Sequence, residues 1–341
     1  MNLRQLSELL GLSQTTISRA LNGYPEVSEE TRKRVLKAAE ETGYRPNRAA
    51  QRLATGKAGS IGLVMPTAPG HNSDVHFGEF QSGLSEEALK HDFHFVIMPA
   101  HPRDEEQAIR WLVASGSVDG YYLAYMREKD SRIAMAKSLG VPFIVHGRSY
   151  GVEDAYPYLD VDNEGAFRDA AELLLDLGHR RFALLNGPDD LDFAIRRKLG
   201  VKSALKSRGL TLAPALTRHT AMTDEHGFRG MSELLRHPDP PTAVLCASTV
   251  LALGAVRAIN TAGLRLGHDI SLIAHDDVLP LLKPEHFTVP LTTTRSSLRA
   301  AGIRVAERLI AQIERTKPQP PEHELWKADL VIRASTGPAP G

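Results

Sequence analysis

The polar side chains best placed for chemistry lie near the start of the chain, on a predicted helix over residues 14–21. Ile17, Ala20 and Leu21 fall on one face of this helix, and the polar residues fall on the opposite face. Gln and Arg can form paired hydrogen bonds with base edges in the major groove, and Ser and Thr can hold phosphates. The polar face, which suits duplex DNA, consists of Gln14, Thr15, Ser18 and Arg19.

The residues before this helix predict a helix-turn-helix. Leu6, Leu9 and Leu10 repeat at helical spacing, Gly11 ends that helix, and Ser13 is placed to cap the next one. The turn between the two helices is only a few residues long, as a helix-turn-helix requires.

A third helix is predicted after Ser28, which offers an N-cap, and Gly43 can close its far end. Val35, Leu36 and Ala39 would complete a small three-helix core. Residues 1–57 contain ten basic and six acidic residues, which gives +4; because the whole chain sums to zero, the remainder has a charge of −4. The positive charge is therefore confined to the end that would meet phosphate. The alternative is that residues 1–44 form only a helical packing unit.

Four motifs occur here in a fixed order: LSQTTISRALNG at 12–23, VSEETR at 27–32, GYRPNR at 43–48 and LATG at 53–56. With these motifs the chain resembles the lac repressor (LacI/GalR) family of bacterial transcription regulators, and weaker motifs extend the resemblance to about residue 335. The resemblance implies base contacts by Gln14, Thr15 and Arg19. It implies phosphate contacts by Ser13, Asn22, Ser28 and Thr31.

The segment after the third helix, residues 47–54, is shorter than the ~12–15 residues at which an isolated helix becomes marginal in water. We expect its helicity to depend on a partner. The resemblance implies a hinge helix that forms when two subunits place it in the minor groove, with Leu53 wedged between base pairs and with Asn47 and Ala50 beside it. The alternative for Leu53 is an ordinary linker leucine.

The rest of the 341 residues alternates between short apolar runs and helical patterns, which predicts two lobes built on parallel sheets. Ligands of such sheets bind beyond the carboxyl ends of the strands, so the loops there should line a cleft between the lobes. The expected strands are 61–65, 93–98, 118–123, 143–146, 182–185, 243–246 and 270–274. The expected helices are 77–90, 105–115, 166–177, 194–207, 225–236, 251–262 and 298–315.

The same resemblance implies a body similar to periplasmic sugar-binding proteins, with an effector between the lobes. Supporting motifs are SIGLVM at 60–65, GHRRFALL at 178–185, PTAVL at 241–245, ALGA at 252–255, HDD at 275–277 and PLTT at 290–293. A guanidinium and a carboxylate can together hold adjacent sugar hydroxyls or the edge of a purine. The expected effector contacts are Phe77, Arg148, Arg197, Met222, Ser248 and Asp276.

Other interpretations of these residues remain open at this stage. Arg197, in a run of three basic residues, could belong to a solvated helix face; Asp276 could be a turn acid or a helix N-cap. Phe77 has the helical spacing of a core residue. Where much of the family has Asn-Asp or Ser-Asp after the sixth strand and Asp-Arg after the fourth, this chain has Ser248–Thr249 and Gly147–Arg148. The ligand of the best-known members therefore cannot be copied. The HGR sequence at 146–148 looks like that of regulators of oligosaccharide or α-glucoside uptake.

Several classes of protein are disfavoured. Cys246 is the only cysteine, so no intramolecular disulfide can form and a reducing compartment is expected. No leader pattern and no apolar stretch of ~18 residues is present, so we expect a cytoplasmic protein without a membrane segment. No motif for catalysis, phosphate transfer or dinucleotide binding occurs, and the cluster of histidines at 71–101 lacks a metal-site pattern. We therefore expect no catalytic residues, no metal and no cofactor.

The sequence thus predicts a homodimeric repressor that binds a near-palindromic operator and is released by a small effector, most simply a sugar. Alternatives are a nucleobase acting as co-repressor, a sugar-binding transport protein and a sugar-acting enzyme. The expected fold class is an all-α helix-turn-helix headpiece plus a two-lobed α/β effector domain. The expected boundaries are 1–45 for the headpiece, 46–58 for the hinge, 59–335 for the effector domain and 336–341 for a mobile tail.

Overall fold

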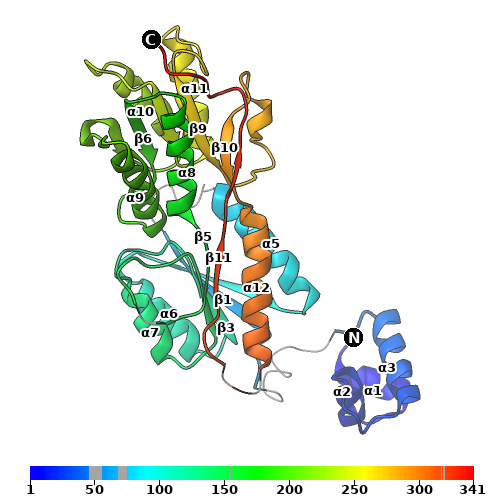
Figure 1. The fold of residues 1–341 in the computed structure, drawn as a ribbon. Helices are drawn as coiled ribbons and strands as arrows, with labels where there is room; N and C mark the ends of the chain where they lie inside the picture. The colour runs from blue at the N-terminus through cyan, green and yellow to red at the C-terminus, as the bar shows by residue number, and fades with distance from the viewer. Residues whose placement is uncertain (46–55, 68–74, 154, 316, 318) are drawn as a thin grey trace. The chain divides into compact units, whose positions relative to one another are not determined.

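The computed structural model describes residues 1–45, 56–67, 75–153, 155–315, 317 and 319–341 (Figure 1). The chain divides into two compact units, residues 1–59 and 60–341, which we call the headpiece and the body. Each unit has its own hydrophobic core.

The headpiece contains three helices, α1 (Leu3–Leu10), α2 (Gln14–Leu21) and α3 (Glu29–Glu41). The predicted caps are confirmed: the side chains of Ser13 and Ser28 cap α2 and α3, and Gly11 ends α1 with φ at 64°. The core joins all three helices and consists of Leu6, Ile17, Ala20, Val27, Val35, Ala38, Ala39 and Tyr44.

One predicted core residue of the headpiece is wrong. Leu36 is 48% exposed, whereas Val35, Ala38 and Ala39 are buried. These three residues follow the i, i+3, i+4 spacing of one helical stripe. Leu36 directly follows Val35, so its side chain is rotated by about 100° around the helix axis from that of Val35. Apolar type alone therefore misplaces Leu36.

The first lobe of the body is built on a six-stranded sheet in the order β11-β5-β4-β3-β1-β2, in which every pair of neighbouring strands is parallel. Its strands are β1 (Ser60–Pro66), β2 (His94–Ala100), β3 (Gly120–Leu123), β4 (Phe143–His146), β5 (Tyr158–Val161) and β11 (His323–Trp326). Its helices are α5 (Val75–Lys90), α6 (Glu105–Ala114), α7 (Ser131–Ser138) and α12 (Leu298–Glu314). Helices α5 and α12 cover one face of the sheet, and α6 and α7 cover the other.

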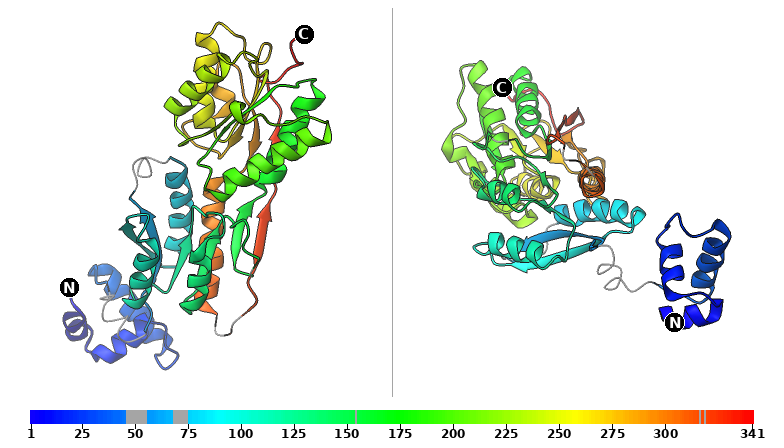
Figure 2. Two further views of the ribbon diagram at one scale, coloured as in Figure 1. Left: turned by 90° about the vertical axis from the view of Figure 1, so that its left-hand side faces the viewer. Right: turned by 90° about the horizontal axis from the view of Figure 1, so that it is seen from below.

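The second lobe repeats this arrangement with the order β12-β10-β9-β8-β6-β7, and only β12 is antiparallel to its neighbour (Figure 2). Its strands are β6 (Phe182–Asn186), β7 (Thr217–His219), β8 (Ala243–Cys246), β9 (Ser271–Asp276), β10 (Thr292–Arg295) and β12 (Asp329–Val331). Its helices are α8 (Asn163–Asp176), α9 (Asp192–Ser207), α10 (Asp224–Leu235) and α11 (Thr249–Thr261), with 3-10 turns η2 (Pro214–Leu216) and η3 (Pro284–His286). Helices α8 and α9 cover one face, and α10 and α11 cover the other.

Three segments cross between the lobes: from β5 to α8, from β10 to α12, and from β11 to β12 (Figure 1). The sequence predicted the apolar strands and most of the helices, but it missed α7, β5, β7, β10, β11 and β12. The missed strands are only three or four residues long and contain polar or charged residues, so they lack an apolar run. Among the described residues, no helix is long and apolar enough to cross a membrane.

The C-terminal residues do not form the mobile tail that was expected. The carbonyl oxygen of Gly337 accepts hydrogen bonds from His179 Nε2 and from Ser271 Oγ, both at 3.1 Å. The amide of Ala339 donates to the carbonyl oxygen of Leu177. Because Gly337 and Ala339 are both hydrogen-bonded to the second lobe, this segment packs against the body.

Helices α5 and α12 approach closely through glycine. A Cβ added to Gly83 would lie 2.0 Å from the carbonyl oxygen of Arg299, and one added to Gly302 would lie 2.1 Å from that of Phe80. Only a residue without a Cβ permits this separation of the two helices.

Gly302→Ala should therefore lower the free energy of unfolding by about 1–3 kcal/mol, because α5 and α12 would have to move apart. Urea denaturation of the full chain measures this change. Gly78→Ala is a matched control on α5, since its added Cβ meets nothing within 4 Å, and it should stabilise the protein by about 0.5–1 kcal/mol. Equal stabilities for Gly302→Ala and the wild type would contradict the close packing of these helices.

Candidate functional site

The polar face predicted for α2 is exposed in the structure. The side chains of Gln14, Thr15 and Arg19 are exposed, and no described residue forms a side-chain hydrogen bond with them. Ile17 and Ala20 on the other side of the helix are buried. Helix α2 therefore packs on one face and presents on the other the residue types that recognise base edges.

The residues predicted to contact phosphate lie at the ends of the headpiece helices. Ser13 Oγ accepts a hydrogen bond from the Thr16 amide at 3.0 Å, and Ser28 Oγ accepts one from the Thr31 amide at 3.3 Å. Asn22 is exposed at the end of α2. Helix N-termini present unpaired amides and positive dipole ends, which favour anions.

The predicted hinge residues Asn47, Ala50 and Leu53 lie outside the described residues. The interpretation of this segment as a minor-groove hinge helix therefore stays a prediction.

A cleft of about 160 Å³ lies between the two lobes of the body. Residues in and after β4, after β3 and at the end of β5 line it from the first lobe, and residues that follow β6, β9 and β10 line it from the second. The carboxyl ends of both parallel sheets thus face the same space, which is the arrangement in which α/β sheets bind ligands.

Aromatic rings form much of the cleft lining. Phe77 lies 6.5 Å from Tyr125, with ring planes 27° apart, and Phe80 stacks on His146 with centroids 4.2 Å apart. Met222 also lines the cleft, as the sequence predicted. Flat apolar faces of this kind suit the C–H faces of a sugar ring or the plane of a base.

Arg197 is buried at the cleft and does not lie on a solvated helix face. Its Nε donates to Asn163 Oδ1 at 2.8 Å, its Nη1 donates to the carbonyl oxygen of Ala247, and its guanidinium lies 5.1 Å and 4.9 Å from the ring centroids of Phe167 and Phe193. Burial lowers the pKa of Arg197 to about 10, so the side chain remains charged at neutral pH.

Arg148 reaches the cleft from the other lobe. Its Nε donates to Asp160 Oδ2 at 2.8 Å, and its guanidinium lies 5.8 Å from the ring centroid of Tyr158. Burial raises the pKa of Asp160, and the neighbouring Arg148 opposes that rise. The cleft therefore receives one guanidinium from each lobe.

The position of the predicted effector carboxylate needs correction. Asp276 does not line the cleft: its Oδ1 accepts from the Val278 amide at 2.8 Å, and its Oδ2 lies 3.6 Å from Arg295 Nε. The next residue, Asp277, does line the cleft, where its Oδ2 lies 3.4 Å from His76 Nε2. Successive side chains at a strand end point to opposite sides, so a shift of one residue changes the side.

Ser248 is likewise outside the cleft lining. Its side chain is fully buried, and its Oγ accepts a hydrogen bond from the Leu251 amide at 3.2 Å as the N-cap of α11. The Ser248 hydroxyl therefore serves as a helix cap inside the second lobe.

The polar residues of the cleft that sequence reasoning missed include Asp160, Asn163, Asp192 and Asp277. Asp192 is buried, accepts a hydrogen bond from Arg196 Nε at 2.7 Å, and has a pKa that burial raises. Each missed residue lies at or just after the carboxyl end of a strand, or at the start of the helix that follows. That placement is the signal that could have identified them.

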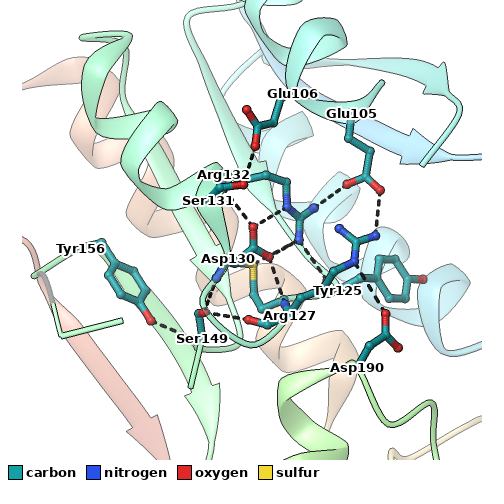
Figure 3. A network of polar contacts seen from close by, with 11 residues as sticks. Glu105, Glu106, Tyr125, Arg127, Asp130, Ser131, Arg132, Ser149, Tyr156 and Asp190 are labelled. Carbon is teal, nitrogen blue, oxygen red and sulfur yellow. Dashed lines mark hydrogen bonds and ion pairs between the residues drawn. The ribbon is translucent and has the colours of Figure 1, made fainter. Parts of the chain in front are cut away.

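The loop after β3, which lines the cleft, is held by a buried network of charges (Figure 3). Arg132 donates to the carbonyl oxygen of Tyr125 at 3.0 Å and forms ion pairs with Asp130 and Glu105 at 2.6 Å and 2.8 Å. Burial opposes ionisation of Asp130, but hydrogen bonds from Arg132 and from the Arg127 amide outweigh it and hold the pKa of Asp130 below its usual value. The network fixes Tyr125 at a φ of 52°, a conformation that costs energy for a non-glycine residue.

The same loop contacts the second lobe directly. The amide of Asp192 donates to the carbonyl oxygen of Met126 at 2.8 Å, and Arg127 Nε lies 3.8 Å from Asp190 Oδ2 (Figure 3). The lobes therefore touch beside the cleft as well as through the three crossing segments.

No group of three His, Cys, Asp or Glu residues in the described part of the chain is arranged to hold a metal ion. The predicted histidine cluster is also spread out where the structure describes it, because His91 pairs with Glu87 whereas His76 lies at the cleft.

The neutral imidazole of His146 should make stability depend on pH. Burial lowers its pKa to about 4. The contribution of the neutral imidazole to the free energy of unfolding is therefore fully present above the ordinary histidine pKa and is lost as the pH falls toward 4. In His146→Gln, the drop in unfolding free energy between about pH 8 and pH 5 should be about 1–2 kcal/mol smaller than in the wild type. Urea denaturation at both pH values measures the drop, and identical drops would contradict this account.

Two family models match the chain. The model "Bacterial regulatory proteins, lacI family" matches residues 3–47, and the model "Periplasmic binding protein-like domain" matches residues 171–336. Among curated proteins, the HTH-type transcriptional regulator AglR of Rhizobium meliloti (strain 1021) is 68% identical over 339 residues, which cover 99% of this chain and 95% of AglR. The HTH-type transcriptional regulator CelR of Thermobifida fusca is 31% identical over 98% of this chain and 97% of CelR.

Solved structures match both units. The lac repressor dimer bound to operator and the anti-inducer ONPF has a TM-score of 0.83 at 27% identity, with 99% of each chain covered. The complex of the transcriptional regulator CelR with cellobiose has a TM-score of 0.71 at 28% identity, covering 98% of this chain and 99% of that chain. The chain therefore belongs to the lacI family of bacterial regulatory proteins, and it is a DNA-binding transcriptional regulator rather than an enzyme.

Proposed function

We propose that the protein is a homodimeric repressor of carbohydrate-utilisation genes, which binds a near-palindromic operator and is released when a neutral sugar occupies the cleft. Two headpieces would place Gln14, Thr15 and Arg19 in successive major grooves, about one helical turn apart. Ser13, Asn22, Ser28 and Thr31 would hold the flanking phosphates. The lac repressor dimer, a structural relative, was solved on its operator.

The chemistry of the cleft supports a sugar as the effector. Aromatic faces lie beside guanidinium and carboxylate groups, so a ligand can stack on rings and hydrogen-bond through adjacent hydroxyls. The CelR relative was solved with cellobiose. A glycosidic compound of the oligosaccharide or α-glucoside type is the class that the sequence motif at residues 146–148 favours.

The charge balance of the cleft favours a neutral ligand over an anionic one. Three carboxylates line the cleft, from Asp160, Asp192 and Asp277, against two guanidinium groups, from Arg148 and Arg197. Three minus two leaves one negative charge. An anionic sugar would therefore meet net repulsion in the cleft.

Release from DNA requires that the sugar prefer one arrangement of the lobes, since equal affinity for both would shift nothing. A coupling of about 1–3 kcal/mol would change operator affinity by roughly 5–150-fold. The observation that supports such a coupling most directly is that Arg148 and Arg197 approach the cleft from different lobes, so one ligand can be held by both.

The function is tested by fluorescence anisotropy of the full-length protein on its own upstream region, at fixed salt, with and without sucrose, maltose, trehalose or cellobiose. One sugar should abolish specific binding in the wild type, and Arg197→Ala should bind the operator but ignore that sugar. Absence of specific binding under all conditions, or tighter binding with a nucleobase such as guanine, would contradict a sugar-released repressor.

Base recognition by α2 is tested separately. Gln14→Ala or Arg19→Ala should each lose about 1–3 kcal/mol of discrimination at one operator position, because a lost base contact removes preference only at that base pair. Anisotropy with single-substituted operators measures this. Lys33→Ala is the control: this exposed cation on α3 should alter affinity uniformly if at all, and unchanged base preference in the α2 variants would remove these residues from direct recognition.

A further inference from the structure

A continuous chain of hydrogen bonds connects the two arginines of the cleft. Arg148 Nε donates to Asp160 Oδ2 at 2.8 Å, Asn163 Nδ2 donates to Asp160 Oδ1 at 3.4 Å, and Arg197 Nε donates to Asn163 Oδ1 at 2.8 Å. We call these four side chains the arginine relay.

The relay passes through the first segment that crosses between the lobes. Asp160 belongs to β5 of the first lobe, and Asn163 is the first residue of α8 in the second. Both side chains are buried. The amide of Val161 also donates to Asp160 Oδ1, so the carboxylate is fixed to the backbone of the crossing segment.

Each guanidinium is held at its Nε, which leaves the outer nitrogens for another partner. Arg197 uses Nη1 for the carbonyl oxygen of Ala247, and no described residue accepts a hydrogen bond from its Nη2. Likewise, neither Nη atom of Arg148 donates to a described residue. A guanidinium held at one edge presents its remaining donors in a fixed plane, which is the geometry that binds paired oxygens well.

We propose that Asp160 and Asn163 are positioning residues of the effector site, which set effector affinity by aligning Arg148 and Arg197 across the lobe crossing. This proposal rests on the sugar-responsive function proposed above. The relay fixes the orientations of the two arginines relative to each other. A polyhydroxylated ligand can therefore hydrogen-bond to both guanidinium groups only at the angle between the lobes that the relay permits. Asp160 and Asn163 act through the arginines and need not contact the ligand themselves.

The affinity test uses isothermal titration of the full-length protein with whichever of sucrose, maltose, trehalose and cellobiose gives the largest response in the wild type. Asp160→Asn removes the charge that holds Arg148 and should weaken binding by about 10-fold or more. In an Arg148→Ala background the same substitution should weaken binding clearly less, because only the link through Asn163 to Arg197 remains. Equal losses in both backgrounds would mean a merely structural role and would overturn the proposal.

Asp239→Asn is the matched control. Arg181 Nε lies 3.1 Å from Asp239 Oδ1 in an ion pair of the same kind, but on an exposed surface outside the cleft, so its loss should leave sugar affinity unchanged. If Asp160→Asn fails to fold, Asn163→Ala breaks the relay at its second link. It should then weaken binding in the wild type and change little in an Arg197→Ala background.

A second measurement needs no sugar. In the full-length protein labelled with ¹⁵N, Asp160→Asn should shift the Nε–Hε resonances of both Arg148 and Arg197, because the relay joins them. A shift confined to Arg148 would overturn the relay whether or not a sugar binds. A wild type that binds none of the sugars but shows both shifts would reject the proposed effector class and leave the alignment of the arginines standing.

Discussion

Burial of the Arg197 guanidinium at the cleft, with Arg148 half-buried opposite, constrains how the two lobes meet. A buried charge needs fixed acceptors, and those for Arg197 come from α8 and from the loop after β8, whereas Arg148 depends on β5. These acceptors are positioned by the meeting of two sheets at their carboxyl ends. The aromatic lining completes the site, because the rings of Phe167 and Phe193 lie beside the Arg197 guanidinium and replace water there.

Much of the architecture could be predicted because it follows from local rules. Ser13, Ser28 and Gly11 are capping residues whose role depends only on neighbouring backbone, and long apolar strands such as β1 and β9 stand out from polar loops. Arg197 and Met222 were placed at the cleft through the family resemblance, and the structure locates them there. Their contacts with an effector remain predictions.

What could not be predicted depends on long-range packing or on a shift of one residue. Asp276 and Asp277 are identical in type, and only the end of β9 decides which one faces the cleft. Strand β5 has only four residues and contains Asp160, so its sequence resembles that of a loop. Only the folded chain brings Arg148 beside Asp160 and accounts for a carboxylate in this strand. The C-terminal residues looked like a loose end because their partners lie more than sixty residues away in the sequence.

The order of the strands has a consequence for synthesis of the chain. Helix α12 and strand β11 complete the first lobe, which otherwise consists of residues 60–161, and β12 with the residues around Gly337 completes the second. Neither lobe can therefore finish its sheet until residues 323–331 have left the ribosome. The headpiece core involves residues 6–44 alone, so it can fold early, while the body that is proposed to control it is completed later in synthesis. A nascent chain would thus contain a folded DNA-binding unit before it contains a completed effector site.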